Sequence, residues 1–135
     1  MDDISKYSGP WTGWSIQDGV RISESLHLVF DGGSISGSGC DKDGDFQIDG
    51  HYNSRTNSVR VTRRYTWTTN LEQEGVGIPY EYNGRWDGMA VAGTWNPRAY
   101  PLYGGPFEMW PDTGEESMEY SLEALGVSSF AGVGE

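Results

Sequence analysis

The sequence predicts an all-β protein: a single eight-stranded antiparallel up-and-down β-barrel followed by an acidic, partly helical C-terminal tail. Three observations carry this prediction. Of 135 residues, 20 are glycine and the aromatic residues comprise 6 Trp, 8 Tyr and 4 Phe, a composition that favours strands with frequent turns and bends. Asp-Gly dipeptides, which suit tight hairpins, begin at residues 18, 31 and 43, which is the spacing of an antiparallel meander. Between the turn signals lie eight strand-like segments.

These segments follow one another with short connections. We expect strands at 10–17, 21–30, 34–40, 45–53, 58–68, 78–86, 89–96 and 105–111. Three Asp-Gly turns separate the first four segments, and the polar stretch 54–57 separates the fourth from the fifth. A long connection, 69–77, precedes the sixth segment. The dipeptide Asp87-Gly88 joins the sixth to the seventh, and an irregular Pro-containing connection, 97–104, leads to the eighth.

A repeated pattern of apolar residue, Gly and aromatic residue at alternate positions indicates how the sheet closes. It occurs in 48–52, 82–86 and 91–95. Because strand side chains alternate between faces, all three residues of each pattern lie on one face. An inward Gly permits sharp bending and lets a neighbouring ring lie across it. We therefore expect a closed barrel, in which 105–111 pairs with 10–17. A two-sheet sandwich is the alternative.

The composition changes after Pro111, which divides the chain into a barrel domain (1–111) and an acidic tail (112–135). The tail has six acidic residues and no basic one. Thr113 and Glu116 resemble a capping box, and Met118, Leu122 and Leu125 follow with helical spacing. The pattern predicts one short helix that is marginal unless it docks.

The sequence resembles the streptavidin-like and lipocalin-like (calycin) barrels. The resemblance rests on the opening Gly9-Pro10-Trp11-Thr12-Gly13-Trp14, the Gly-x-aromatic strands and the short hairpins. The sequence also resembles an uncharacterised barrel module of this kind, whose motifs follow the order found in 37–41, 46–50, 82–88, 93–95 and 105–109. The resemblance covers residues 8–111 and implies the barrel fold and its strand order.

The resemblance transfers no ligand, because the residues that would bind one differ. Avidins place a polar Asn or Asp-Ser set after the first Trp, whereas 12–15 here read Thr-Gly-Trp-Ser. Lipocalins place an Arg on the last strand, and no Arg or Lys follows Arg98. Nitrobindin-like barrels need a late haem-binding His, whereas His27 and His51 are both early. No cofactor is expected.

Charge excludes several kinds of partner. The formal net charge is -11 with His neutral, so neither a nucleic-acid backbone nor an anionic membrane surface is expected as a partner.

Cys40 is the only cysteine, so no intrachain disulfide forms. The N-terminus lacks the basic and apolar stretches of a secretory signal. We expect a soluble, cytoplasmic monomer or weak oligomer.

The sharpest site candidate is Arg63. In 58–68, Arg63 shares its strand face with the apolar residues Val59, Val61, Tyr65 and Trp67, so this face should point inward. A buried guanidinium needs a partner. Glu24 shares its face with Ile22, Leu26, Leu28 and Phe30, so it is the expected partner.

Three interpretations of Arg63 remain open. It is half of a structural Arg–Glu pair at one end of the barrel, an Arg that reaches solvent at the rim, or a hook for an anionic ligand, framed by Tyr65, Tyr82 and Trp86. Removing Glu24 should separate these interpretations, because a structural pair would leave Arg63 buried and alone.

Other candidate sites are weaker. Asp41, Asp43 and Asp45 alternate as in a calcium loop, but Phe46 and Tyr52 replace the Gly and Glu that such a loop needs. An acidic hairpin with at most weak Ca²⁺ binding is expected. His27 and His51 should both point outward, without metal-ligand spacing. No nucleophile elbow or phosphate loop is present.

The expected function is therefore binding without chemistry. The first hypothesis is a lumen that holds a small organic ligand, including an anionic one, oriented by Arg63. The second is a protein-interaction module with a filled barrel that docks through its loops or acidic tail. An enzyme of unknown class is the least supported hypothesis, because nothing in the sequence selects a catalytic pair of residues.

Overall fold

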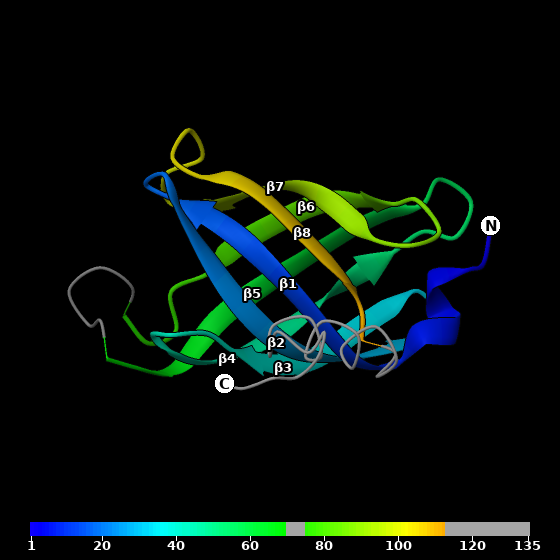
Figure 1. Ribbon diagram of the computed structural model, residues 1–135, viewed down its shortest axis with the longest axis horizontal. Helices are drawn as coiled ribbons and strands as arrows, with labels where there is room; N and C mark the ends of the chain where they lie inside the picture. Colours follow the sequence, from blue (N-terminus) through cyan, green and yellow to red (C-terminus); the bar gives the residue numbers. More distant parts are fainter. Residues whose placement is uncertain (70–74, 113–135) are drawn as a thin grey trace, which may run out of the picture.

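The computed structural model, which describes residues 1–69 and 75–112, is a closed antiparallel barrel of eight strands (Figure 1). A short 3₁₀ helix, η1 (Ile4–Tyr7), precedes the strands. These are β1 (Gly9–Gln17), β2 (Val20–Asp31), β3 (Ser34–Cys40), β4 (Gly44–Tyr52), β5 (Ser58–Thr68), β6 (Tyr80–Trp86), β7 (Val91–Pro97) and β8 (Gly105–Pro111). Each strand pairs with its neighbours in sequence, so the topology is up-and-down.

The first and last strands close the barrel, as the sequence predicts. Trp11 lies opposite Pro111, and Ser15 lies opposite Phe107. This pairing confirms the barrel and excludes the two-sheet sandwich. Closure leaves no strand with an unpaired edge, which is the feature that makes open sheets prone to edge-to-edge association.

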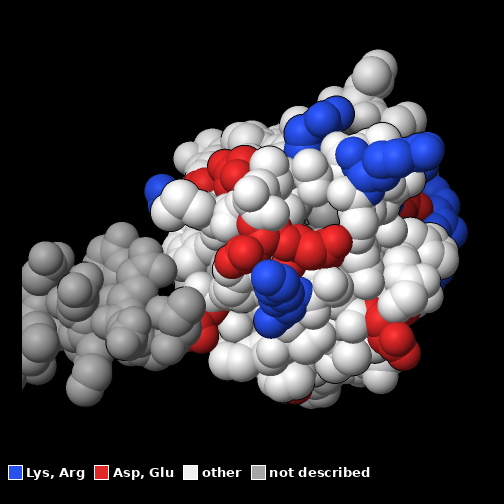
Figure 2. Space-filling model, turned by 90° about the vertical axis from the view of Figure 1, so that its right-hand side faces the viewer, with Lys and Arg blue, Asp and Glu red and all other residues white. Residues whose placement is uncertain are grey.

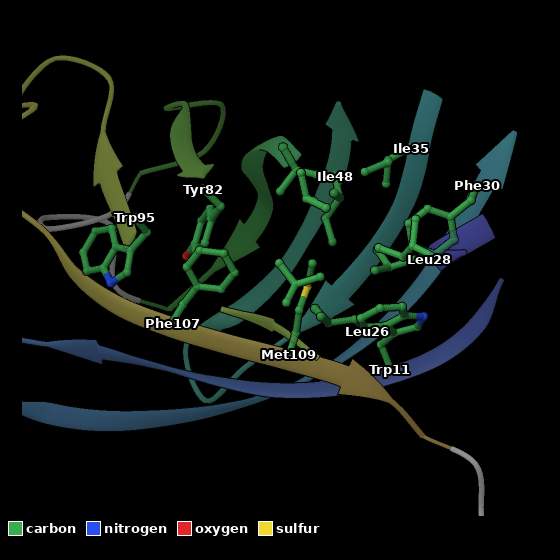
Figure 3. Close-up of a cluster of buried hydrophobic side chains, with 14 of the residues drawn as sticks. Trp11, Leu26, Leu28, Phe30, Ile35, Ile48, Tyr82, Trp95, Phe107 and Met109 are labelled. Atoms are coloured by element: carbon green, nitrogen blue, oxygen red, sulfur yellow. The ribbon is translucent and has the colours of Figure 1, made fainter. Parts of the chain in front are cut away.

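The lumen is packed with alternate residues of every strand. β2 shows the alternation most regularly: every second residue from Ile22 to Phe30 is buried, and the residues between them are exposed. Figure 3 shows the side chains that meet in the lumen, with Trp95, Tyr82 and Phe107 toward one end and Trp11 and Phe30 toward the other. The period of two in the sequence therefore separates the core from the surface.

Inward glycines allow neighbouring strands to approach closely. Gly93 of β7 lies directly opposite Gly84 of β6. A β-carbon at Gly93 would overlap the Asn83 carbonyl oxygen and lie 2.5 Å from the Gly84 Cα atom. At Gly39, a β-carbon would lie 2.7 Å from the ring of Phe46. Gly84 and Gly93 both belong to the repeated Gly-x-aromatic pattern, where the sequence predicts sharp bending.

The Asp-Gly dipeptides contribute to the turns in different ways. Asp18 and Gly19 form the β1–β2 turn themselves, with φ of 52° and 77°. In the second dipeptide, Asp31 is the last residue of β2 and the turn is built from Gly32 and Gly33. In the third, Gly44 already begins β4. The hairpin at Asp87-Gly88 forms as predicted, with the Asp87 side chain accepting hydrogen bonds from the backbone N–H groups of residues 89 and 90.

The prediction that Trp67 points inward is wrong. The pairing of β4 with β5 shifts by one residue, so that Asp45 lies opposite Trp67 and Phe46 lies opposite Tyr65. This β-bulge reverses the side-chain alternation beyond Tyr65. Trp67 is consequently 57% exposed, and its neighbour Thr68 is buried instead.

The two ends of the barrel differ. At one end, the plug end, which carries the β2–β3, β4–β5 and β6–β7 connections, η1 packs against β2 (Figure 1). There the indole N–H of Trp86 donates to the Asp2 carbonyl at 2.7 Å, and that of Trp11 donates to the Tyr7 carbonyl at 2.8 Å. Figure 2 looks onto this end, where acidic side chains lie across the middle with a basic one directly below them, and other basic side chains lie along the upper and right edges. The other end, the cavity end, carries the β1–β2, β3–β4, β5–β6 and β7–β8 connections.

Ile4 is the apolar anchor of the plug, because it is only 3% exposed and belongs to the main core. Replacing Ile4 with alanine should lower the free energy of unfolding by about 2 kcal/mol, the low end for such truncations, because a site near the barrel end can partly collapse. Chemical denaturation checks this value. The control is Lys6→Ala in the same helix, where the exposed pair with Asp2 should contribute less than about 1 kcal/mol. Equal losses in both variants would show that Ile4 does not anchor the plug.

The predicted tail helix and the predicted boundary after Pro111 fall almost entirely outside the described residues. The last described residue, Asp112, donates its backbone N–H to the carbonyl of Pro10, which extends the β1–β8 pairing by one step. No helix within residues 1–69 and 75–112 has the length and apolar character that crossing a membrane requires.

Candidate functional site

A buried ion pair crosses the lumen between β2 and β5. Nη1 of Arg63 lies 2.8 Å from Oε1 of Glu24, and Nη2 lies 2.5 Å from Oε2. The two side chains are 5% and 1% exposed. Two parallel charge-assisted hydrogen bonds fix the geometry of both groups. The sequence prediction that these two residues face inward and meet is confirmed.

Aromatic rings enclose the guanidinium of Arg63. Its Cζ atom lies 3.9 Å from the ring centroid of Tyr82 and 4.6 Å from that of Phe46. Burial, the largest single effect, would lower the pKa of Arg63, but the carboxylate of Glu24 and the nearby Tyr82 and Tyr65 together outweigh burial and raise the pKa above its ordinary value. Arg63 therefore stays charged, and its charge is balanced within the lumen by Glu24.

A cavity lies just beyond this pair, at the cavity end of the barrel. The centre of a water molecule can occupy about 30 Å³ of it, and all of its space that no atom fills, partly open to solvent, measures roughly 400 Å³. The described residues that line it are five with aromatic rings, Phe46, Tyr65, Tyr80, Tyr82 and Trp95, and five others, Ser15, Gln17, Ile22, Asp41 and Arg63. The smaller volume holds about two water molecules, so it fits one small group of a larger molecule.

Tyr82 forms part of the floor of this cavity. Its ring contacts Phe107 edge-on, with 5.1 Å between the ring centroids, and lies near-parallel to Trp95 at 6.2 Å. Burial raises the pKa of the Tyr82 hydroxyl above its ordinary value. The hydroxyl therefore remains protonated at physiological pH and can donate a hydrogen bond.

Asp41 contributes the carboxylate of the cavity wall. Its Oδ1 accepts hydrogen bonds from the backbone N–H groups of Asp43 and Gly44, at 2.9 and 3.2 Å. Its Oδ2 accepts one from the Tyr65 hydroxyl at 2.5 Å. These contacts hold the β3–β4 hairpin and aim the carboxylate at the cavity end of the lumen.

The three acids of the predicted calcium loop point in different directions. Asp43 is paired with Lys42 at 3.1 Å, whereas Asp45 is exposed on the outer face of β4. Within the part of the chain that the structure describes, no group of three or more His, Cys, Asp or Glu side chains could hold a metal ion. The hairpin is organised by hydrogen bonds to Asp41 instead.

The structure brings together four of the five predicted ligand-binding residues. Arg63, Tyr65 and Tyr82 line the cavity, and Glu24 holds Arg63 from behind. Trp86 does not belong to this site, because it lies at the plug end and packs against Trp11 with 5.9 Å between the ring centroids. Tyr80 and Trp86 lie at opposite ends of β6, and it is Tyr80 that lines the cavity.

Several residues of the cavity were not predicted. Ser15 shares its strand face with Trp11, so the alternation of β1 could have placed it in the lumen. Trp95 belongs to the repeated Gly-x-aromatic pattern, which marks it as an inward ring. Asp41 lies in a turn, where strand alternation gives no direction. His27 and His51 are exposed on the outer surface, as predicted.

The sequence was compared with models of protein families and with curated proteins, and neither comparison finds a match. The structure itself defines the class of protein by its fold, which is an eight-stranded, up-and-down antiparallel β-barrel with one plugged end.

Proposed function

We propose that this protein is a non-catalytic binding barrel that holds a small organic ligand at its cavity end. One observation carries the proposal: aromatic rings, a carboxylate and hydroxyl groups surround a single cavity beside a rigid ion pair. Ligand sites typically combine mostly apolar walls with a few placed polar groups. The five rings supply such walls, while Ser15, Tyr82 and Asp41 supply the polar groups.

The size of the cavity supports a particular way of binding. The 30 Å³ that admits the centre of a water molecule accepts one small group, whereas the rest of the ligand would lie in the wider space toward solvent. The resemblance of the sequence to streptavidin-like and lipocalin-like barrels supports the same location, because barrels of these families hold one small ligand in the lumen.

Arg63 serves this site as part of the wall. Both of its Nη atoms are already bonded to Glu24, so an anionic ligand would have to compete with a carboxylate that is covalently part of the barrel. This geometry favours the structural interpretation of the pair over the anion hook.

The proposal predicts that filling the cavity abolishes binding. Ser15→Leu places an apolar side chain among the lining residues, whereas Ser23→Leu adds the same side chain on the exposed face of β2. A fragment library should be screened by NMR, following the indole N–H of Trp95, which donates to the Ile16 carbonyl at 3.0 Å. Fragments that shift this signal should bind at least about tenfold more weakly to Ser15→Leu, because the leucine side chain occupies part of the space that the fragment needs.

The Ser23→Leu variant should bind those fragments as the unaltered protein does. The proposal is overturned if no fragment shifts the Trp95 signal, or if Ser15→Leu and Ser23→Leu bind equally well.

A second candidate function, a protein-interaction module, is favoured by exposed apolar side chains at the cavity end. In the β7–β8 connection, Tyr100 is 70% exposed and Leu102 is fully exposed. Val76 and Ile78 of the β5–β6 connection are exposed as well. Exposed apolar loops of this kind are features of docking surfaces. Under this alternative, Leu102→Asp would weaken association with a partner and leave fragment binding in the cavity unchanged.

A further inference from the structure

We propose that the ligand of this cavity carries a compact organic cation, an ammonium or methylated ammonium group, held among Tyr65, Tyr80, Trp95 and Asp41. The inference rests on the proposed binding function and specifies the chemical class of the ligand. It depends on the arrangement of the rings, on the balance of charge in the lumen, and on the cation–ring contact that Arg63 already makes inside the barrel.

The three rings stand as walls around the cavity. Tyr65 and Tyr80 meet at 85° with 6.3 Å between their centroids, and Tyr80 and Trp95 meet at 61° with the same separation. All three rings line the same cavity, so they border it from several sides as a box. A box of aromatic faces attracts cations through the negative potential above each ring and is the usual recognition element for methylated ammonium groups.

The charges in the lumen favour a cation over an anion. Among the described residues of the cavity wall, the one basic group, Arg63, is neutralised by two hydrogen bonds from its guanidinium to Glu24. The acidic group in the wall, Asp41, accepts hydrogen bonds from Tyr65 and from two backbone N–H groups, but forms no salt bridge with any described Lys or Arg. Among the described lining residues, the charge of Asp41 is therefore not balanced by a basic side chain, and the net charge of -11 adds a field that attracts cations.

The Tyr65 hydroxyl strengthens this preference. Because it donates a hydrogen bond to Asp41, electron density on the Tyr65 ring rises and the ring becomes a better partner for a cation. The same bond fixes the carboxylate beside the ring. A ligand cation would thus meet the ring face and the carboxylate together.

The barrel already binds one cation in this manner. The guanidinium of Arg63 lies over Tyr82 and Phe46, two rings of the same cavity. Of the other rings that line the cavity, Trp95 lies opposite Tyr82 and Tyr65 lies opposite Phe46, while Tyr80 lies two residues nearer the cavity end of β6. The ligand would provide a second cation among these three rings.

A matched set of three probes tests this inference. Choline, 3,3-dimethylbutan-1-ol and 3,3-dimethylbutanoate have nearly the same shape and differ in charge: positive, neutral and negative. Each is titrated into the full-length protein at low salt, and the Trp95 indole N–H signal is followed by NMR. We expect choline to bind at least about tenfold more tightly than the alcohol, as a cation–ring contact with a carboxylate would give, and the anion to bind most weakly.

Variants assign the effect to the proposed residues. Asp41→Asn removes the charge but keeps an oxygen for the turn, and it should reduce the preference for choline over the alcohol by about tenfold. The matched control is Asp45→Asn, which removes the same charge from the exposed face of the next strand and should preserve the preference. Tyr80→Leu removes a wall of the box without touching the turn, so it tests the cage even if Asp41→Asn does not fold.

The outcomes separate this inference from the binding function. If the alcohol or the anion shifts Trp95 at least as effectively as choline, the ligand is not a cation, but the cavity still binds small molecules. If choline is preferred and both Asp41→Asn and Tyr80→Leu keep that preference, the cation lies elsewhere and the inference is overturned. If neither these probes nor any library fragment shifts Trp95, the binding function fails as well.

Discussion

Replacing Glu24 with leucine should destabilise the barrel by about 3–5 kcal/mol, the cost of leaving a buried charge without its partner. Among the described residues, no other acceptor takes the place of Glu24, since even the Nε atom of Arg63 is buried without a hydrogen-bond partner. The rings of Tyr82 and Phe46 lie over the guanidinium and hold it in place. Urea denaturation at neutral pH measures the loss.

A double replacement distinguishes the charge effect from a packing effect. Glu24→Leu combined with Arg63→Met removes both charges and should recover most of the lost stability, to within about 1–2 kcal/mol of the unaltered protein, because apolar substitutes for buried ion pairs are often neutral. As a control, Glu81→Leu breaks the more exposed pair with Arg98 and should cost no more than about 1 kcal/mol. A Glu24→Leu loss as small as the Glu81→Leu loss would show that Arg63 finds water or another acceptor.

Replacing Gly93 with alanine should cost about 3 kcal/mol or more, at the upper end for overpacked sites, because the added methyl group meets backbone atoms that cannot rotate away. The Asn83 carbonyl oxygen and the Gly84 Cα atom both lie within the space that this group would occupy. Relief requires β6 and β7 to separate, which weakens the hydrogen bonds between them. Thermal unfolding followed by circular dichroism measures the loss.

Gly77 provides a contrasting control. Its φ is 83°, and nothing lies within 4 Å of the position that a β-carbon would occupy. Gly77→Ala should therefore cost only the left-handed backbone penalty, about 1–2 kcal/mol. If Gly93→Ala costs less than Gly77→Ala, the close approach of β6 and β7 is not a constraint on the fold.

Much of the fold follows from the sequence because its signals are local. Turn residues divide the chain, and side-chain alternation assigns each strand residue to the core or to the surface. All eight strands occur where the pattern predicts them, with ends that differ by at most two residues. Alternation also placed Arg63 and Glu24 on inward faces. Their meeting follows from energetics, because a buried guanidinium without a carboxylate would be too costly.

The errors arise where the local rules do not apply. The bulge beside Phe46 has no Gly or Pro in β5 to announce it, so the reversal that exposes Trp67 could not be seen in the sequence. The misplacement of Trp86 has another cause. Alternation tells whether a side chain faces the lumen, but only the pairing of strands tells how far along the barrel axis it lies. Asp41 was considered only as a weak candidate for a metal ligand and was not placed in the cavity, because a turn carboxylate does not reveal which groups donate hydrogen bonds to it.

Closure of the barrel by β1 and β8 has a consequence for the order of events in folding. The seven other strand pairings join segments adjacent in the chain, and each can form as a local hairpin at a small entropic cost. The contact between Trp11 and Pro111 instead joins residues that are about 100 positions apart in sequence. Non-local contacts of this kind slow folding. The chain should therefore pass through a curved sheet with two unpaired edges, and a nascent chain cannot complete its hydrogen bonding until residues 105–111 have left the ribosome.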